Sequence, residues 1–151
     1  MMLFVPNIYW GIKGKPEGYS DETEADHKIL LIMERIGEAL VTVSLLIFRS
    51  IDPHIKKLPE GVYFRWTMII WLTSFVLMIL YECYWIRYFK SQRRLQDFYK
   101  SYAGFPLAGA TLPVIAALLL GLYSGNVILI CAALILGIGH IGIHLVHMRD
   151  I

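Results

Sequence analysis

Four long apolar segments occupy more than half of this 151-residue chain and limit what it can fold into. They cover 29–48, 66–86, 105–123 and 127–146, and each can cross about 30 Å of hydrocarbon as a helix that rises about 1.5 Å per residue. Hydrophobic residues make up 57% of the chain and charged residues only 17%, which is not the profile of a soluble domain. We therefore expect residues 1–151 to form one all-α domain, a polytopic membrane protein with four transmembrane helices in an antiparallel bundle.

Basic residues beside these segments predict the orientation of the chain. With the N-terminus in the cytoplasm, nine of the 14 Lys and Arg residues flank the spans on the cytoplasmic side and four lie outside. This bias favours a multi-pass protein of the plasma membrane with both termini cytoplasmic. The net charge of +2 gives no reason to expect a nucleic-acid partner, because the basic residues are explained by topology and lipid headgroups.

The stretch between the second and third spans predicts an additional, interfacial helix. In residues 91–102, one helical face carries apolar and aromatic side chains: Leu95, Phe98, Tyr99 and Tyr102. Such an amphipathic helix is expected to lie flat at the membrane surface. Three nearby arginines are expected to contact anionic lipid headgroups: Arg87, Arg93 and Arg94. The alternative is that these three residues bind the phosphate group of a substrate.

The last apolar segment contains the most unusual polar residues of the chain. Between Val127 and Val146 the only polar side chains are Cys131, His140 and His144. Ionisable groups in hydrocarbon are functional candidates whose partners should be identified. The partners available in other spans are Glu34 and Glu38 in the first, and Glu82 in the second.

These five ionisable residues are expected at similar depths. Counted at about 1.5 Å per residue from the cytoplasmic ends of their helices, they lie within roughly 14 Å of the interface. The four-residue spacings place the two histidines on one helix face and Glu34 with Glu38 on another. We therefore expect His140 within direct or water-mediated hydrogen-bonding reach of a carboxylate, and the first and fourth spans as neighbours.

Each residue taken alone also has a purely structural explanation. Glu34 follows the start of its helix and precedes Arg35, so it could reach the cytoplasm, and histidines often join helices in membrane bundles. The convergence of all five favours a pocket that opens to the cytoplasm. Tyr81 and Thr111 fall at similar depth, so the candidate ligand-binding residues are Glu34, Glu38, Tyr81, Glu82, Thr111, His140 and His144.

Three functions are compatible with such a pocket. The first is binding or transport of a small molecule or ion, with a homo-oligomer as the working form because four helices enclose little volume. The second is an intramembrane enzyme that uses Glu and His in acid-base or metal chemistry on a lipid-like substrate. The third is an accessory subunit without chemistry. The expected partners are the bilayer and a small or lipid-like ligand.

A divalent metal is the one cofactor that the residue types suggest. Carboxylate and imidazole ligands suit zinc, iron or manganese, and the candidate ligands are Glu38, Glu82, His140 and His144. Haem is not expected, because both core histidines lie on one helix. The chain also lacks a His-Glu-x-x-His motif, a Gly-x-Ser-x-Gly motif and a phosphate-binding glycine loop.

Four sequence blocks, which together extend over most of the chain, carry a resemblance. They are Glu34-Arg35-Ile36-Gly37, Trp85-Ile86-Arg87-Tyr88-Phe89, Gly109-Ala110-Thr111-Leu112-Pro113-Val114 and the Gly-Ile-Gly-His-Ile-Gly-Ile-His run that begins at Gly137. These blocks resemble those of an uncharacterised family of small four-helix bacterial integral membrane proteins. The resemblance implies fold and location, and it implies no activity.

Overall fold

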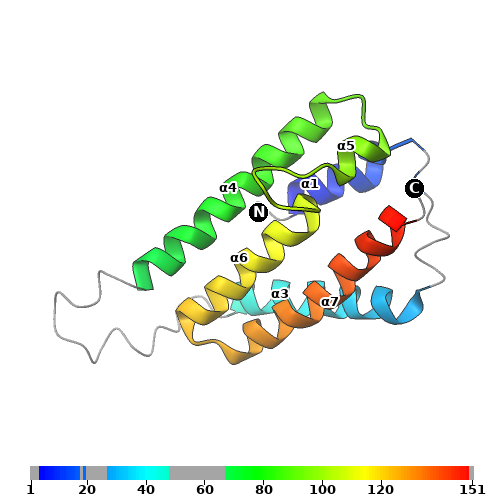
Figure 1. Ribbon diagram of the computed structural model, residues 1–151. Helices are drawn as coiled ribbons and strands as arrows, with labels where there is room; N and C mark the ends of the chain where they lie inside the picture. Colours follow the sequence, from blue (N-terminus) through cyan, green and yellow to red (C-terminus); the bar gives the residue numbers. More distant parts are fainter. Residues whose placement is uncertain (1–3, 18, 20–26, 48–66, 150–151) are drawn as a thin grey trace.

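The computed structural model is all-helical in the part of the chain that it describes, residues 4–17, 19, 27–47 and 67–149 (Figure 1). The four main helices are α3 (Lys28–Ile47), α4 (Thr67–Lys90), α6 (Ala108–Ser124) and α7 (Val127–Arg149). They correspond to the four predicted apolar segments, with shifts of a few residues at the ends. The expected all-α class is therefore confirmed.

Neighbouring helices of the bundle pack in the order α3, α7, α6 and α4. Their directions alternate, so that the start of α3, the end of α4, the start of α6 and the end of α7 lie at one end of the molecule (Figure 1). We call this the α5 end, after the short helix α5 (Leu95–Tyr99) that lies there. The predicted neighbours, the first and fourth apolar segments, are in contact as α3 and α7.

Two of the four helices, α4 and α7, are long and apolar enough to cross a membrane. Only 28% and 33% of their most apolar stretches are buried inside the molecule. Helix α6 is apolar but shorter, and α3 carries Glu34, Arg35 and Glu38 along its middle.

A tight turn joins α6 to α7, as the sequence Ser124-Gly125-Asn126 predicts. Gly125 has a φ of 63°, a left-handed conformation that glycine adopts without steric cost. The amide of Asn126 donates to the carbonyl of Gly121 at 3.0 Å, and the side-chain oxygen of Asn126 accepts from the amide of Leu129 at 3.1 Å. Asn126 thus ends one helix and caps the next, which holds α6 and α7 antiparallel.

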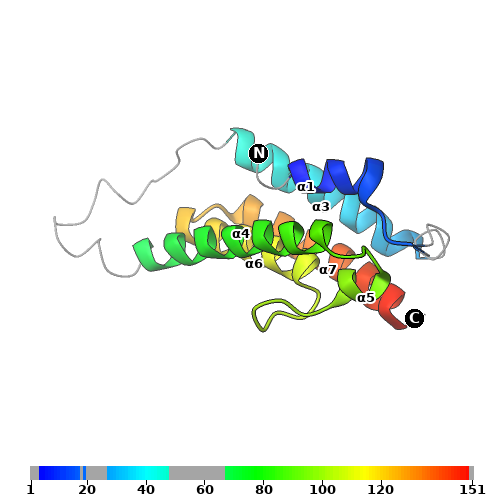
Figure 2. The same ribbon diagram turned by 90° about the horizontal axis from the view of Figure 1, so that it is seen from above.

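The N-terminal residues form two short helices that were not expected from the sequence. These are α1 (Phe4–Tyr9) and the π-helical turn η1 (Trp10–Gly14). They lie in the same layer as α3, over the C-terminal half of α4 (Figure 2). Tyr81 donates to Asn7 Oδ1 at 3.0 Å, and Tyr88 donates to the carbonyl of Gly14 at 2.7 Å. Two buried tyrosines of α4 therefore hold the N-terminal helices in place.

Helix α5 is shorter than the predicted helix over 91–102, and its main apolar side chain faces the protein. Phe98 is buried and stacks on Trp10 with 5.6 Å between ring centroids. Tyr99 and Tyr102 are partly buried against the same cluster of buried side chains. Phe98 is therefore part of the bundle core, and the location of α5 at a membrane surface stays a prediction.

Candidate functional site

The site begins where α3 and α7 approach each other most closely. A Cβ atom added to Gly139 would clash with the backbone of Glu34, and one added to Gly37 would lie 2.5 Å from Cα of Leu136. Only glycine allows this separation of the two backbones. The small residues of α7 therefore place the acidic stretch of α3 directly beside the histidine stretch.

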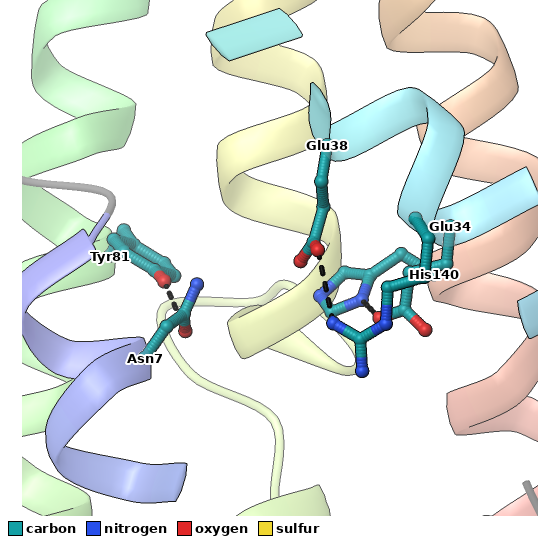
Figure 3. Close-up of polar contacts among 6 residues, drawn as sticks. Asn7, Glu34, Glu38, Tyr81 and His140 are labelled. Atoms are coloured by element: carbon teal, nitrogen blue, oxygen red, sulfur yellow. Dashed lines mark hydrogen bonds and ion pairs between the residues drawn. The ribbon is translucent and has the colours of Figure 1, made fainter. Parts of the chain in front are cut away.

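Glu34 and His140 meet at this contact. Glu34 Oε1 and His140 Nδ1 lie 2.5 Å apart in a hydrogen bond, and both side chains are largely buried (Figure 3). Gly139 lets the two helices approach each other, and the next residue along α7, His140, supplies the imidazole. The contact expected between His140 and an acidic residue of another span is thus present, and the partner is Glu34.

His144 lies one helical turn beyond His140 on α7, toward the α5 end. Its ring centroid lies 4.8 Å from that of His140 and 5.4 Å from that of Phe98. Tyr99 approaches the same ring at 5.9 Å. Aromatic side chains of α5 therefore cover the second histidine.

Glu38 lies one turn beyond Glu34 on the same side of α3 (Figure 3). Its carboxylate accepts from the Arg35 guanidinium at 3.2 Å, and the two side chains are 39% and 65% exposed, respectively. Such an exposed pair contributes little to stability. Glu38 and Arg35 can therefore change partners more readily than Glu34 and His140.

A cavity of about 480 Å³ lies between the N-terminal helices, α3 and α7. Glu34, Arg35, Glu38 and both histidines line it from one side. The remaining lining residues come from the N-terminal segment and the α5 end: Asn7, Trp10, Gly11, Lys15, Tyr19, Trp85, Phe98, Gly109 and Ile143. We call it the polar cavity.

A second hollow of about 580 Å³ continues from the polar cavity along α3. The two share four lining residues, namely Asn7, Arg35, Glu38 and His140. Beyond these, most of the lining is apolar: Ile8, Val41, Leu45, Leu46, Met78, Pro113, Ala116, Ala117, Leu120 and Leu136, with Thr42 and Ser74 as the other polar residues. We call it the apolar groove. It exists because α3 packs on α7 and leaves a space beside α4.

Three predicted ligand-binding residues do not line either hollow. Glu82 lies on α4 away from the cavity, and its buried Oε1 has no hydrogen-bond partner in the described part of the chain. Thr111 donates to the carbonyls of Pro106 and Leu107, within its own helix start. Tyr81 is fully buried and acts through Asn7, which it fixes at the shared wall of the two hollows.

Three of the four predicted metal ligands, Glu38, His140 and His144, line the polar cavity, and Glu82 does not. Among residues 4–17, 19, 27–47 and 67–149, no group of three or more His, Cys, Asp or Glu side chains is placed to hold a metal ion. Glu82 is separated from the other candidates because it lies outside both hollows. The arrangement of His140 beside Glu34 is that of a hydrogen-bonded pair within a larger cavity.

The predicted headgroup arginines have different surroundings. The Arg87 guanidinium donates to the carbonyls of Asp97 and Ser101 and lies 5.2 Å from the centre of the Tyr102 ring. Arg87 thus ties α5 and the segment that follows it to the end of α4. Arg93 donates to the carbonyl of Lys13, and Arg94 is exposed. Contact of Arg93 and Arg94 with headgroups stays a prediction.

Sequence reasoning missed the N-terminal side of the polar cavity. Val5, Ile8 and Ile12 are spaced as on one face of a helix, and all three are exposed. This spacing was the available signal for a short helix with an apolar outer face. The inner face of the same segment supplies Asn7 and Trp10 to the cavity.

Comparison of the chain with protein-family models, with curated proteins and with solved structures finds no match. The interpretation of the site therefore comes from its own geometry.

Proposed function

We propose that this protein is a small integral membrane protein that binds or transports a small molecule or ion, which it holds in the polar cavity. In this proposal all four main helices cross the plasma membrane with both termini in the cytoplasm. The α5 end, and with it the cavity, then lies on the cytoplasmic side.

Support for membrane insertion comes from the outer surfaces of the helices. On α3, an uninterrupted row of exposed apolar side chains runs along the whole helix: Ile29, Ile32, Ile36, Leu40, Val43 and Ile47. Exposed apolar residues also line α4, among them Ile69, Leu72, Phe75, Val76 and Ile79. Apolar surface on this scale needs a covering of lipid or protein. Glu34, Arg35 and Glu38 of α3 line the cavity, and Lys28 is the first residue of the helix, so these charges are compatible with a helix that crosses the membrane.

The observation that carries the binding function is the Glu34–His140 pair in the wall of an open cavity. Two ionisable side chains from different helices share one hydrogen bond beside about 480 Å³ of space. Polar groups at membrane depth mark substrate and ion pathways more often than they serve packing alone. A carboxylate and an imidazole in contact can also exchange a proton when a ligand enters.

The test is to identify the small molecules and metals that stay bound to the protein during purification. The chain is purified in mild detergent, and co-purified small molecules and metals are identified by mass spectrometry and elemental analysis. We expect a stoichiometric small molecule in the parent protein. It should be lost in Glu38→Gln and in His140→Ala, because the first substitution removes a carboxylate charge and the second removes an imidazole from the wall shared by the two hollows.

Matched controls are Glu17→Gln and His27→Ala, which change the same residue types away from both hollows. These variants should retain the molecule and show the same monodisperse profile as the parent. Retention at the parent level in both Glu38→Gln and His140→Ala would contradict the binding function and favour an accessory subunit.

A further inference from the structure

The polar cavity and the apolar groove form one continuous space with a polar end and an apolar end. Asn7, Arg35, Glu38 and His140 stand at the junction and line both parts. We propose that this space takes a single-chain amphiphile with an uncharged head that carries hydrogen-bond acceptors, with the chain in the apolar groove. The inference rests on the proposed binding function and specifies the class of ligand.

The charges of the polar cavity are already matched within the chain. Glu34 is hydrogen-bonded to His140, and Glu38 is paired with Arg35. The Lys15 ammonium lies over the ring of Trp10, 5.6 Å from its centre. The Glu34–His140 pair is largely buried, so a charged head that met it would have to displace a polar partner, whereas an uncharged head would not.

The groups left to bind a head are neutral donors. The indole N–H groups of Trp10 and Trp85 are buried, and each interacts with a tyrosine hydroxyl, that of Tyr88 and Tyr81 respectively, without the geometry of a good hydrogen bond. Both residues line the polar cavity, and Trp85 is only 4% exposed. A buried donor without a well-placed acceptor is costly, so an acceptor oxygen on the ligand, such as an ester carbonyl or a hydroxyl, completes the hydrogen bonding of these two indoles.

The apolar groove has the shape and access that an alkyl chain requires. It follows α3 from Glu38 to Leu46, a rise of about 12 Å. Two exposed apolar side chains that line it, Ile8 at 59% and Leu46 at 71%, give the opening an apolar edge. Because α3 does not pack along α4, a chain can enter sideways from the bilayer while its head reaches the polar cavity.

The test uses defined probes and native mass spectrometry of the detergent-solubilised full-length protein. The main probe is monolauroylglycerol, which has a neutral ester and diol head. Three others vary one property each: monohexanoylglycerol shortens the chain, laurate makes the head anionic, and dodecyltrimethylammonium makes it cationic. We expect monolauroylglycerol to bind at one per chain and at least about tenfold more tightly than the other three.

Two pairs of variants locate the probe. Thr42→Phe fills the apolar groove, and its control Val43→Phe places the same bulk on the exposed face of α3. Thr42→Phe should weaken monolauroylglycerol binding about tenfold, the loss expected when roughly two methylene groups leave apolar contact. Val43→Phe should stay within about twofold. Trp10→Phe removes a donor from the head site, and its control is Trp71→Phe, which lies outside both hollows.

The outcomes separate this inference from the proposed function. Equal or tighter binding of laurate or dodecyltrimethylammonium would overturn the uncharged head. Equal binding by the two phenylalanine variants of α3 would overturn the place of the chain. Either result leaves a ligand-binding cavity in place if His140→Ala still loses its co-purified molecule. If no probe binds and no molecule co-purifies with the parent, both proposals are wrong.

Discussion

Glu34 and His140 lie 106 positions apart in the sequence, and their side chains share a hydrogen bond of 2.5 Å between the first and last helices of the bundle. The pair depends on Gly139, since any larger residue there would push Glu34 away. In an apolar surrounding, each member needs the other as a polar partner. The contact is therefore both a link between helices and the polar centre of the cavity.

Removal of the Glu34 carboxylate should destabilise the protein more than removal of its neighbour. We expect Glu34→Ala to lower the free energy of unfolding by about 1–3 kcal/mol, because a buried imidazole loses its partner. Glu38→Ala should lower it by less than about 1 kcal/mol, because the pair with Arg35 is exposed. Denaturant titration in detergent, followed by circular dichroism, measures both. Equal losses of unfolding free energy in the two variants would contradict a larger contribution of the buried hydrogen bond to stability.

Gly139→Ala should separate α3 from α7. The added methyl group meets backbone atoms of Glu34 that cannot move independently of the helix, and overpacking of this kind typically costs about 1–3 kcal/mol. Gly11→Ala is the control, since a Cβ there meets nothing within 4 Å although Gly11 lines the same cavity. Thermal unfolding of the two variants in one detergent compares them. A Gly139→Ala protein as stable as Gly11→Ala would contradict the close packing.

The main helices could be predicted from the sequence because each one is a long apolar run with clear ends. The turn around Gly125 was also predictable, because three residues between two apolar runs leave space only for a tight hairpin. The contact of α3 with α7 followed from depth and polarity. Polar side chains in an apolar surrounding are stabilised by contact with one another, and the apolar segments contain few ionisable residues that could serve as partners.

The direction of each polar side chain could not be predicted in the same way. Depth along a helix axis gives no information on rotation about it, and successive residues differ by about 100°. Tyr81 therefore points at Asn7 while Glu82, the next residue, lies outside the cavity. The N-terminal helices were missed because they are short and contain Pro6 and Gly11, which are weak helix formers in isolation.

The arginines near α5 should fall into two functional groups. Replacement of Arg93 and Arg94 by glutamine should weaken association with anionic lipid, as measured by retention of anionic against zwitterionic lipid on the purified protein, and leave ligand retention in the cavity unchanged. Arg87→Gln should act differently, because its guanidinium holds the backbone carbonyls of Asp97 and Ser101. We expect faster hydrogen exchange in residues 95–102 of that variant. Unchanged lipid retention in the double variant would leave the two arginines without a headgroup role.

Cysteine labelling tests the orientation of the whole bundle. The native Cys83 and Cys131 are free, so both are first replaced by alanine, and single cysteines are then introduced at Asn126 and at Ser20. With the N-terminus in the cytoplasm, a membrane-impermeant maleimide added to intact cells should label the cysteine at Asn126 and spare the one at Ser20 until the cells are opened. The expectation comes from the nine basic residues on the proposed cytoplasmic side against four on the other. The opposite pattern would place the cavity of Glu34 and His140 on the outer side of the membrane, and labelling of both sites in intact cells would contradict an odd number of crossings between them.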